Sequence, residues 1–312
     1  MNRFLKPAGI FLFILAVCSN PAAAEKYDKA GDDSRATNGW STFLRGGAVH
    51  QFDSDLGGGG SFKADRFFVQ GGLGYAFDRY RNISLALGYG YDGYDFSGQG
   101  PFAGLHPWDD IHAFRISAPF RWGFGPDWQV FVIPSLRYTA ESGADFGSAA
   151  TGGGFAGFAY RFSDRLTLGP GIGAVTQIED DASIFPVLIV NWKITDRLSL
   201  QTGRGLGATL GPGLTLNWQA SAGWDVFFGG RYESLRFRLD DKGFASGGVG
   251  EDNSFPLVGG ATYRFGRKGD VSLVGGLKLG GELRVEDEKG NPIIDETYDS
   301  ALFLGLTFRL RF

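Results

Sequence analysis

The sequence has very little cysteine, methionine or histidine. Its 312 residues include one cysteine, one methionine and three histidines. The cysteine, Cys18, and the methionine, Met1, both lie within the first 24 residues. The remaining chain therefore has no thiol for a disulfide or a Cys/His metal cluster, which suits an oxidising compartment.

Long hydrophobic runs are also absent after the first 24 residues. The longest apolar run extends from about Ile184 to Val190 and is interrupted by Pro186. A membrane-spanning helix needs ~18 or more consecutive apolar residues, so helical spans are excluded. The remaining way to cross a bilayer is a closed barrel, whose strands satisfy all backbone groups between themselves.

Glycine and aromatic residues are abundant by contrast. Glycine accounts for 51 of the 312 residues, well above the ~7% of an average chain. No Gly-X-Y period accompanies it, which excludes collagen. An aromatic content of 15% excludes a disordered polar chain.

The first 24 residues have the pattern of a secretory signal peptide. Arg3 and Lys6 precede the ten-residue apolar stretch 8–17, and three alanines at 22–24 supply a cleavage site. The alternative is a lipoprotein signal ending at Cys18, although Val17 is a poor residue before a lipidated cysteine. We therefore expect a signal peptide at 1–24, a flexible polar leader at 25–39 and a folded domain at 40–312.

From Trp40 onward, large apolar residues alternate with small or polar ones. In residues 83–91, isoleucine, leucine and tyrosine occupy every odd position, whereas the even positions hold serine, alanine and glycine. The final segment, 302–312, alternates in the same way and ends on Phe312. A period of two is typical of strands with one apolar face.

Turn signals between these strands alternate between short and long. The short breaks fall near 78–82, 123–127, 163–165, 195–197, 220–223 and 266–269. The long breaks fall near 53–60, 97–110, 141–150, 179–182, 203–211, 240–254 and 287–299. Six short and seven long breaks predict an all-β, antiparallel up-and-down transmembrane barrel of 14 strands, with both termini at the short-turn end. Twelve strands is the alternative, because the pair near 198–218 is short.

Aromatic residues flank the short turns on the apolar face. They are Phe77, Trp122, Trp128, Phe162, Trp192, Trp218, Trp224, Phe265 and Phe312. Amphipathic rings favour the headgroup level of a bilayer, so this clustering predicts a membrane aromatic belt. The competing interpretation is a β-sandwich with an aromatic interior, which leaves the signal peptide and the terminal Phe unexplained.

Together these features resemble a Gram-negative outer-membrane β-barrel protein. The ending LGLTFRLRF at 304–312 resembles the C-terminal assembly signal of that class, which implies insertion by the barrel assembly machinery. The stretch GGLKLGGE at 275–282 looks most like an uncharacterised barrel family, a domain of unknown function. The resemblance implies an outer-membrane location and contacts with lipid and lipopolysaccharide, and it brings no catalytic residues.

Strand parity assigns thirteen basic side chains to the small or polar face, which we expect to line the lumen. They are Arg45, Arg66, Arg115, Arg121, Arg137, Arg161, Lys193, Arg231, Arg264, Lys278, Arg284, Arg309 and Arg311. Five acidic side chains share this face: Asp92, Glu179, Asp225, Glu233 and Glu282. These charges either brace the wall as ion pairs or attract anions into a basic lumen.

The acidic surplus of the chain, whose net charge is -4, falls in the long breaks. Loop carboxylates there are either solvated or bind divalent cations that bridge lipopolysaccharide phosphates. We expect a passive channel or small-solute transporter. The alternative is a structural or adhesive surface barrel with a blocked lumen.

An enzymatic function has little support in the sequence. The three histidines, His50, His106 and His112, lie toward the long-loop end, and no His-x-Ser pair occurs. Asp110 and His112 share strand parity, but an exposed pair at a strand end is a weak signal. No metal, phosphate-binding or nucleic-acid motif is present, so we expect neither catalysis nor a cofactor.

Overall fold

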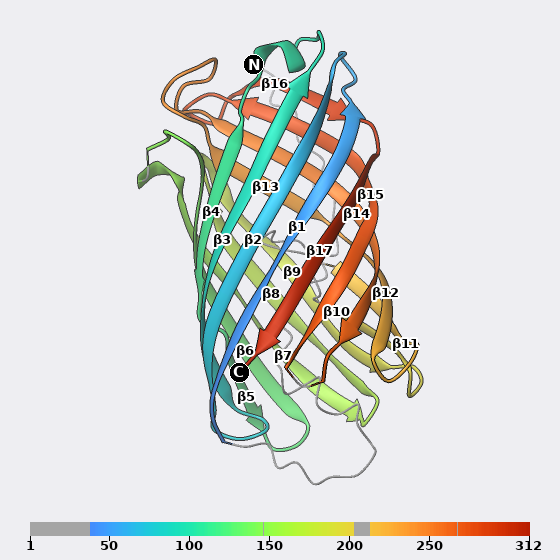
Figure 1. Ribbon diagram of the computed structural model, residues 1–312. Coiled ribbons are helices and arrows are strands. Elements are labelled where there is room, and N and C mark those ends of the chain that lie inside the picture. The colour runs from blue at the N-terminus through green and yellow to red at the C-terminus, as the bar shows by residue number, and fades with distance from the viewer. Residues whose placement is uncertain (1–37, 146, 203–212, 267) are drawn as a thin grey trace.

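The computed structural model describes residues 38–145, 147–202, 213–266 and 268–312. In these residues, one antiparallel sheet closes on itself into a barrel when β1 pairs with β17 (Figure 1). The predicted signal peptide, most of the leader and the loop at 203–211 lie outside the described residues.

The described strand segments come in chain order around the barrel. They are β1 (Gly39–Asp55), β2 (Ser61–Ala76), β3 (Asn82–Ser97), β4 (Asp110–Ser117), β5 (Phe120–Phe124), β6 (Trp128–Glu141), β7 (Ala150–Ser163), β8 (Leu166–Gln177), β9 (Asp180–Lys193), β10 (Leu198–Thr202), β11 (Gly213–Gln219), β12 (Trp224–Arg231), β13 (Glu233–Arg238), β14 (Val249–Arg264), β15 (Gly269–Glu286), β16 (Pro292–Tyr298) and β17 (Ala301–Arg311). Three strands are interrupted, giving the pairs β4/β5, β12/β13 and β16/β17, so the barrel has 14 strands. The predicted fold and strand number are confirmed, and the short pair β10–β11 is part of the wall.

The two-residue alternation determines which side chains face outward. On β3, Ile83, Leu85 and Leu87 are exposed on the outer face, whereas Ala86 between Leu85 and Leu87 is 3% exposed.

The two ends of the barrel differ in their connections. We call the end with the short turns the turn end and the opposite end the loop end. No helix in the described ranges is long and apolar enough to cross a membrane.

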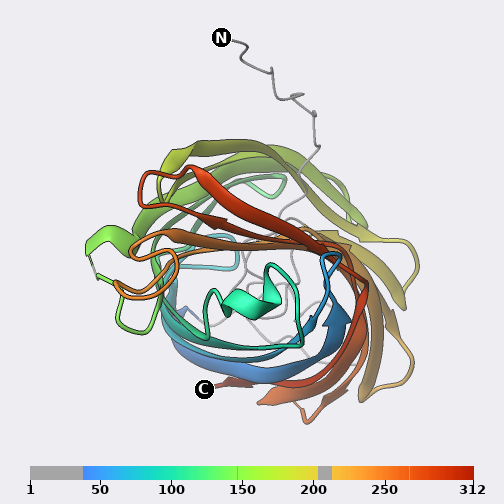
Figure 2. The ribbon, with the colours of Figure 1, turned by 90° about the horizontal axis from the view of Figure 1, so that it is seen from above.

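The barrel narrows at its loop end because β13 leaves the outer wall. β13 pairs with β14 on one side and meets β6 on the other, where Arg238 lies beside Ala140. The bridge between Leu56 and Tyr298 joins β1 to β16. Nine strands thus form a closed ring, which we call the outer tier: β1, β2, β3, β4, β6, β13, β14, β15 and β16. The strands β7–β12 remain outside this ring (Figure 2).

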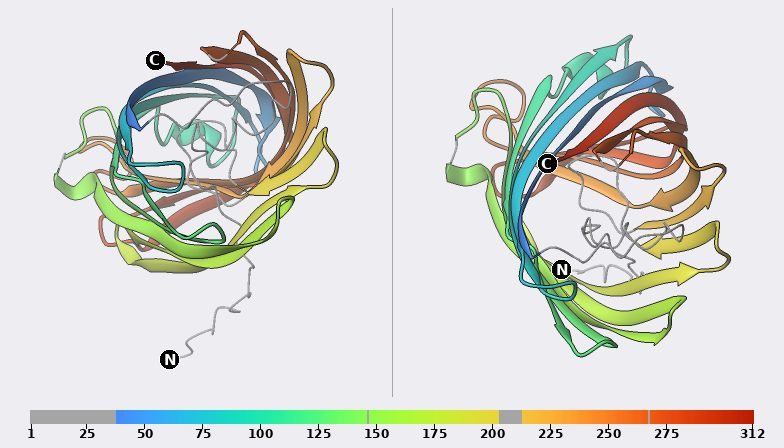
Figure 3. Two further views of the ribbon diagram at one scale, coloured as in Figure 1. Left: turned by 90° about the horizontal axis from the view of Figure 1, so that it is seen from below. Right: turned by 60° about the horizontal axis from the view of Figure 1, so that its bottom comes forward.

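A packed apolar core fills the outer tier. The β3–β4 connection, which contains the 3-10 helix η2 (Ala103–Leu105), lies across the mouth (Figure 2). Its Phe102 and Trp108 pack with Phe62 and Phe237, and all four side chains are at most 1% exposed. A barrel of about eight strands is just wide enough for side chains to fill, whereas 14 strands enclose a wider interior. Figure 3 shows the ring of strands from the turn end.

Several breaks that were expected to be long are shorter than the sequence indicated. β14 begins at Val249 and β16 occupies Pro292–Tyr298, so parts of the long breaks expected at 240–254 and 287–299 are strand. Only residues 178–179 separate β8 from β9. For β14 and β16 the difference arises because the strands of the outer tier continue beyond the apolar outer surface.

Candidate functional site

An apolar band surrounds the outer face of the barrel. Toward the loop end it stops at outward polar pairs: His50 Nδ1 lies 2.7 Å from Asp65, and Lys63 Nζ lies 2.8 Å from Asp95. At the turn end lie the nine predicted belt aromatics, of which Trp122 is half-buried and the others are exposed. Trp40, which the sequence analysis left out, joins them and packs edge-on against Tyr75 at 5.1 Å.

Twelve of the basic residues predicted to line the lumen lie between Arg66 and Arg311. Eleven of these point to the inner face, because their neighbours in each strand point outward. They are Arg66, Arg115, Arg121, Arg137, Arg161, Lys193, Arg231, Arg264, Lys278, Arg309 and Arg311. Arg45 is also on this face and donates to Gln70 at 2.6 Å.

Arg284 lies on the opposite face, contrary to the parity argument. Gly280 has a left-handed backbone with φ +58°. Lys278 before it and Leu283 after it both point inward, so the alternation shifts by one residue at this glycine. Arg284 therefore points outward and pairs with Glu282 at 2.5 Å, which removes both residues from the predicted lumen set.

The lumen face of the turn end carries several basic side chains. Its basic side chains are Arg121, Arg161, Lys193, Arg264, Arg309 and Arg311, which we call the basic rim. Arg264 pairs with Asp225 at 2.9 Å, and Arg311 lies 3.6 Å from Asp270. Among the described residues, Asp225 and Asp270 are the acidic side chains printed in ion pairs with members of the rim.

A second basic pair lies higher in the lumen. Arg115 on β4 and Arg137 on β6 are directly opposite one another in register. With Gln70 and Gly88 they line a cavity of about 20 Å³, room for roughly one water molecule. Two basic side chains therefore face the same part of the lumen from neighbouring strands.

A network of buried charges lies directly beneath the core of the outer tier. Asp252 accepts hydrogen bonds from Arg66 at 2.8 Å, Tyr94 at 2.9 Å and Tyr298 at 2.9 Å, and Lys278 lies 3.4 Å away. We call this network the ionic cluster; its charged members are Arg66, Lys278, Arg231, Asp92, Glu233 and Asp252. Three basic and three acidic groups balance, so the cluster is a neutral brace across five strands and not an anion site.

Asp252 connects β14 to four other strands. Its partners Arg66, Tyr94, Lys278 and Tyr298 lie on β2, β3, β15 and β16.

The Asp110–His112 pair is real, but its geometry differs from a catalytic triad. His112 Nε2 lies 3.0 Å from both Asp110 Oδ2 and Ser142 Oγ, and Ser142 donates to Asp110 at 2.8 Å. In a triad the acid holds the other ring nitrogen, and here that nitrogen contacts the Tyr89 hydroxyl at 2.8 Å. The described residues also contain no group of three or more His, Cys, Asp or Glu side chains suited to a metal.

Sequence reasoning anticipated ion pairs that brace the wall, but it missed the outer tier and the central residue of the ionic cluster, Asp252. It placed Asp252 in an exposed acidic loop, whereas this side chain is buried between strands. The alternation of Leu235, Phe237 and Leu239 was a usable signal for a half-buried strand. No local signal indicates that this strand crosses to β6, because that contact depends on residues about 100 positions away.

No protein-family model matches the chain, and no curated protein matches it. Among solved structures, an outer-membrane channel from Pseudomonas putida F1 superposes with a TM-score of 0.51 at 10% identity, covering 91% of this chain and all of that one. A FadL homologue from Pseudomonas aeruginosa gives a TM-score of 0.46 at 12% identity, with 88% of this chain and 90% of that chain covered. The first likeness concerns the fold alone, and the second is too distant to add to it. The chain thus has a closed 14-strand antiparallel barrel fold, and this outer-membrane channel is similar to it in fold.

Proposed function

We propose that the chain is an outer-membrane channel for small solutes that prefers anions and is gated by the outer tier. The observation that carries this proposal is the change in width along one lumen. Fourteen strands enclose a wide inner part, and a nine-strand ring with a packed core closes the loop end. A closed wall around a wide interior suits the passage of solutes. For the channel to open, the packed core of the outer tier has to move.

The apolar band and its aromatic girdle support placement in a bilayer. Short turns at one end and longer connections at the other are typical of outer-membrane barrels, with the turn end in the periplasm. The terminal Phe312, which is 75% exposed on the outer face, fits recognition by the barrel assembly machinery. Outer-membrane lipid and lipopolysaccharide are the surroundings this placement implies.

The basic rim supports a preference for anions. Its charges lie on one ring of strands, so their fields add wherever the lumen is narrow enough for its low-dielectric walls to limit screening. At physiological salt the Debye length is about 8 Å, so the preference weakens as salt rises.

Charge reversal at the rim is expected to change ion selectivity. Replacing Arg161 and Arg309 by Glu lowers the net charge of the rim by four. The reversal potential in a salt gradient, measured across planar bilayers, then shifts toward cation preference. The matched control is Arg165→Glu, because Arg165 lies in the adjacent β7–β8 turn and pairs outside the lumen with Asp196 at 2.9 Å.

If the channel conducts and both lumen substitutions leave its reversal potential unchanged, the rim does not set the ion preference. An equal shift from Arg165→Glu contradicts a role for the rim as well, because surface charge alone then accounts for the effect.

The alternative function is a structural or adhesive surface barrel with a permanently blocked lumen. The packed core of the outer tier is the observation that favours it. The two functions differ in one respect: a gated channel opens in the intact protein, whereas a blocked barrel passes no current. An outer-membrane hydrolase is less well supported, given the hydrogen bonding of His112.

A further inference from the structure

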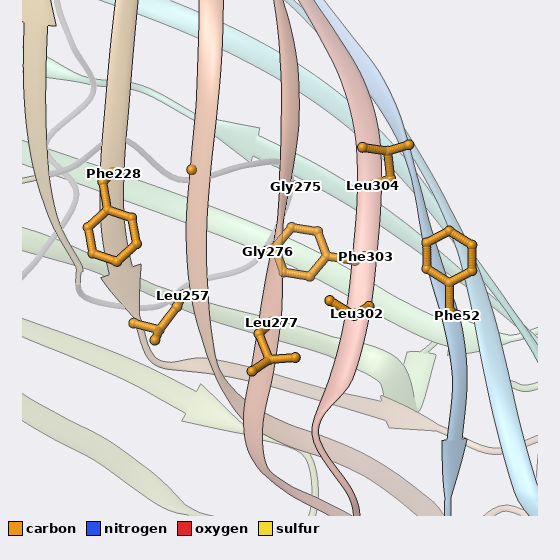
Figure 4. A pocket seen from close by; sticks show the side chains of 10 residues that line it. Phe52, Phe228, Leu257, Gly275, Gly276, Leu277, Leu302, Phe303 and Leu304 are labelled. Atoms are coloured by element: carbon orange, nitrogen blue, oxygen red, sulfur yellow. The ribbon is translucent and has the colours of Figure 1, made fainter.

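A groove of about 540 Å³ lies on the outside of the barrel across β12, β14, β15, β17 and β1 (Figure 4). Its size falls within the ~300–1,000 Å³ range of small-molecule sites. It belongs neither to the lumen nor to the outer tier. We call it the glycine groove, and its main lining residues are Phe228, Leu257, Gly259, Gly275, Leu277 and Leu304.

The groove exists because two outward positions in one row lack side chains. Gly259 and Gly275 are directly opposite one another on β14 and β15. Phe228 on β12 and Leu304 on β17 continue the same row on either side. The next row, Leu257–Leu277–Leu302, forms one wall. Two adjacent glycines between large side chains therefore produce a hollow in the outer surface.

The protein itself does not fill this hollow. A Cβ added at Gly259 meets nothing closer than the Phe227 carbonyl oxygen at 3.6 Å. At Gly275 the nearest atom is the Phe303 carbonyl oxygen at 3.3 Å. From inside, the Phe303 ring lies against Gly276, so the floor is solid and the groove opens only outward.

We propose that the glycine groove binds one acyl chain of a lipid in the leaflet nearest the loop end. This inference rests on the proposed placement of the apolar band in a bilayer. The groove lies in that leaflet because Leu302 is near the start of β17 and Phe52 follows His50, which marks the edge of the band. Its lining side chains are all hydrocarbon, so water has no hydrogen-bonding partner among them.

A second copy of the chain fits the groove poorly. A symmetric dimer places the same patch of each copy against the other, and two hollows facing one another leave a void. A compact hydrocarbon solute fills only part of a groove that extends over five strands. An acyl chain is long and flexible, and the bilayer presents such chains to this surface continuously.

The experiment uses the full-length protein in vesicles of phosphatidylethanolamine, a fraction of which carries a photoactivatable diazirine on one acyl chain. After irradiation, mass spectrometry maps the labelled residues. We expect several-fold more label at Leu257, Leu277 and Leu304 than at Leu85 and Leu87, which are lipid-facing leucines outside the groove.

Filling the groove supplies the decisive comparison. Gly259→Leu should remove the enrichment, whereas Gly71→Leu should retain it. Gly71 is also an outward glycine, with its nearest neighbour 3.8 Å from an added Cβ, but it does not line the groove. If the Gly259→Leu variant does not fold, Gly275→Ala adds a side chain to the floor of the same groove and replaces it in the comparison.

Even labelling over all five leucines overturns the acyl-chain site while leaving the bilayer placement intact. Absence of label from all five leucines overturns the placement of the apolar band in the bilayer. Equal loss in both glycine variants, displacement of the label by toluene, or a dimer in native mass spectrometry that Gly259→Leu disrupts each overturn the proposal. The last two assign the groove to a small solute or to a second copy.

Discussion

Replacing Asp252 by Ala is expected to lower the free energy of unfolding of the outer tier by about 3–5 kcal/mol, the usual effect of removing one partner from a buried ion pair. The loss is large because Arg66 and Lys278 keep their charges in a buried position without the carboxylate that neutralises them. Tyr94 and Tyr298 also lose their acceptor. Hydrogen–deuterium exchange of residues 233–239 and 249–254 measures this local stability.

Two further variants separate charge from general disruption. Asp252→Asn keeps the shape of the side chain but not its charge, so we expect substantial destabilisation from this change alone. Asp295→Ala removes an exposed carboxylate on β16, and surface substitutions usually change stability by less than ~0.5 kcal/mol. If Asp252→Ala and Asp295→Ala give the same exchange rates, the ionic cluster does not brace the outer tier.

Replacing Leu87 by Arg is expected to destabilise the inserted barrel by about 2–4 kcal/mol, the cost of a basic side chain on the lipid face near the midplane. Leu87 is 56% exposed on the outer face, near the middle of the apolar band. Urea titration of the protein folded in lipid vesicles measures the change in the free energy of unfolding.

The matched control is Gly88→Ser on the next residue, whose side chain points into the lumen. An added Cβ there meets Gln70 Cγ at 3.6 Å, which is an ordinary contact, so the expected effect is small. The opposite ranking of the two variants would falsify the register, because a shift by one residue exchanges the two faces.

The sequence was sufficient to predict the barrel because its information is local. The alternation through Ile83, Leu85 and Leu87 determines which face of β3 is apolar, and the turn residues set the strand count. Parity also placed most of the basic residues correctly on the inner face. Arg284 is the exception, since one left-handed glycine, Gly280, reverses the alternation for the rest of β15.

The outer tier was beyond such reasoning because it depends on contacts between distant segments. Trp108 packs against Phe237 with ring centroids 5.1 Å apart, although 129 positions separate them. Asp252 is buried only because β2, β3, β15 and β16 bring polar partners to it. Trp108 and Asp252 each resemble a loop residue in their own sequence context.

Single-channel recording in planar bilayers tests the central claim, that the barrel is a channel closed by its outer tier. We expect the intact protein to show brief, anion-preferring openings. Asp252→Ala should lengthen the open time many-fold with the same anion preference, because the variant loosens the seal and leaves the basic rim intact. Steady current that is unchanged by Asp252→Ala would contradict the gate. Absence of current from the intact protein would contradict the channel and favour a structural barrel with a blocked lumen.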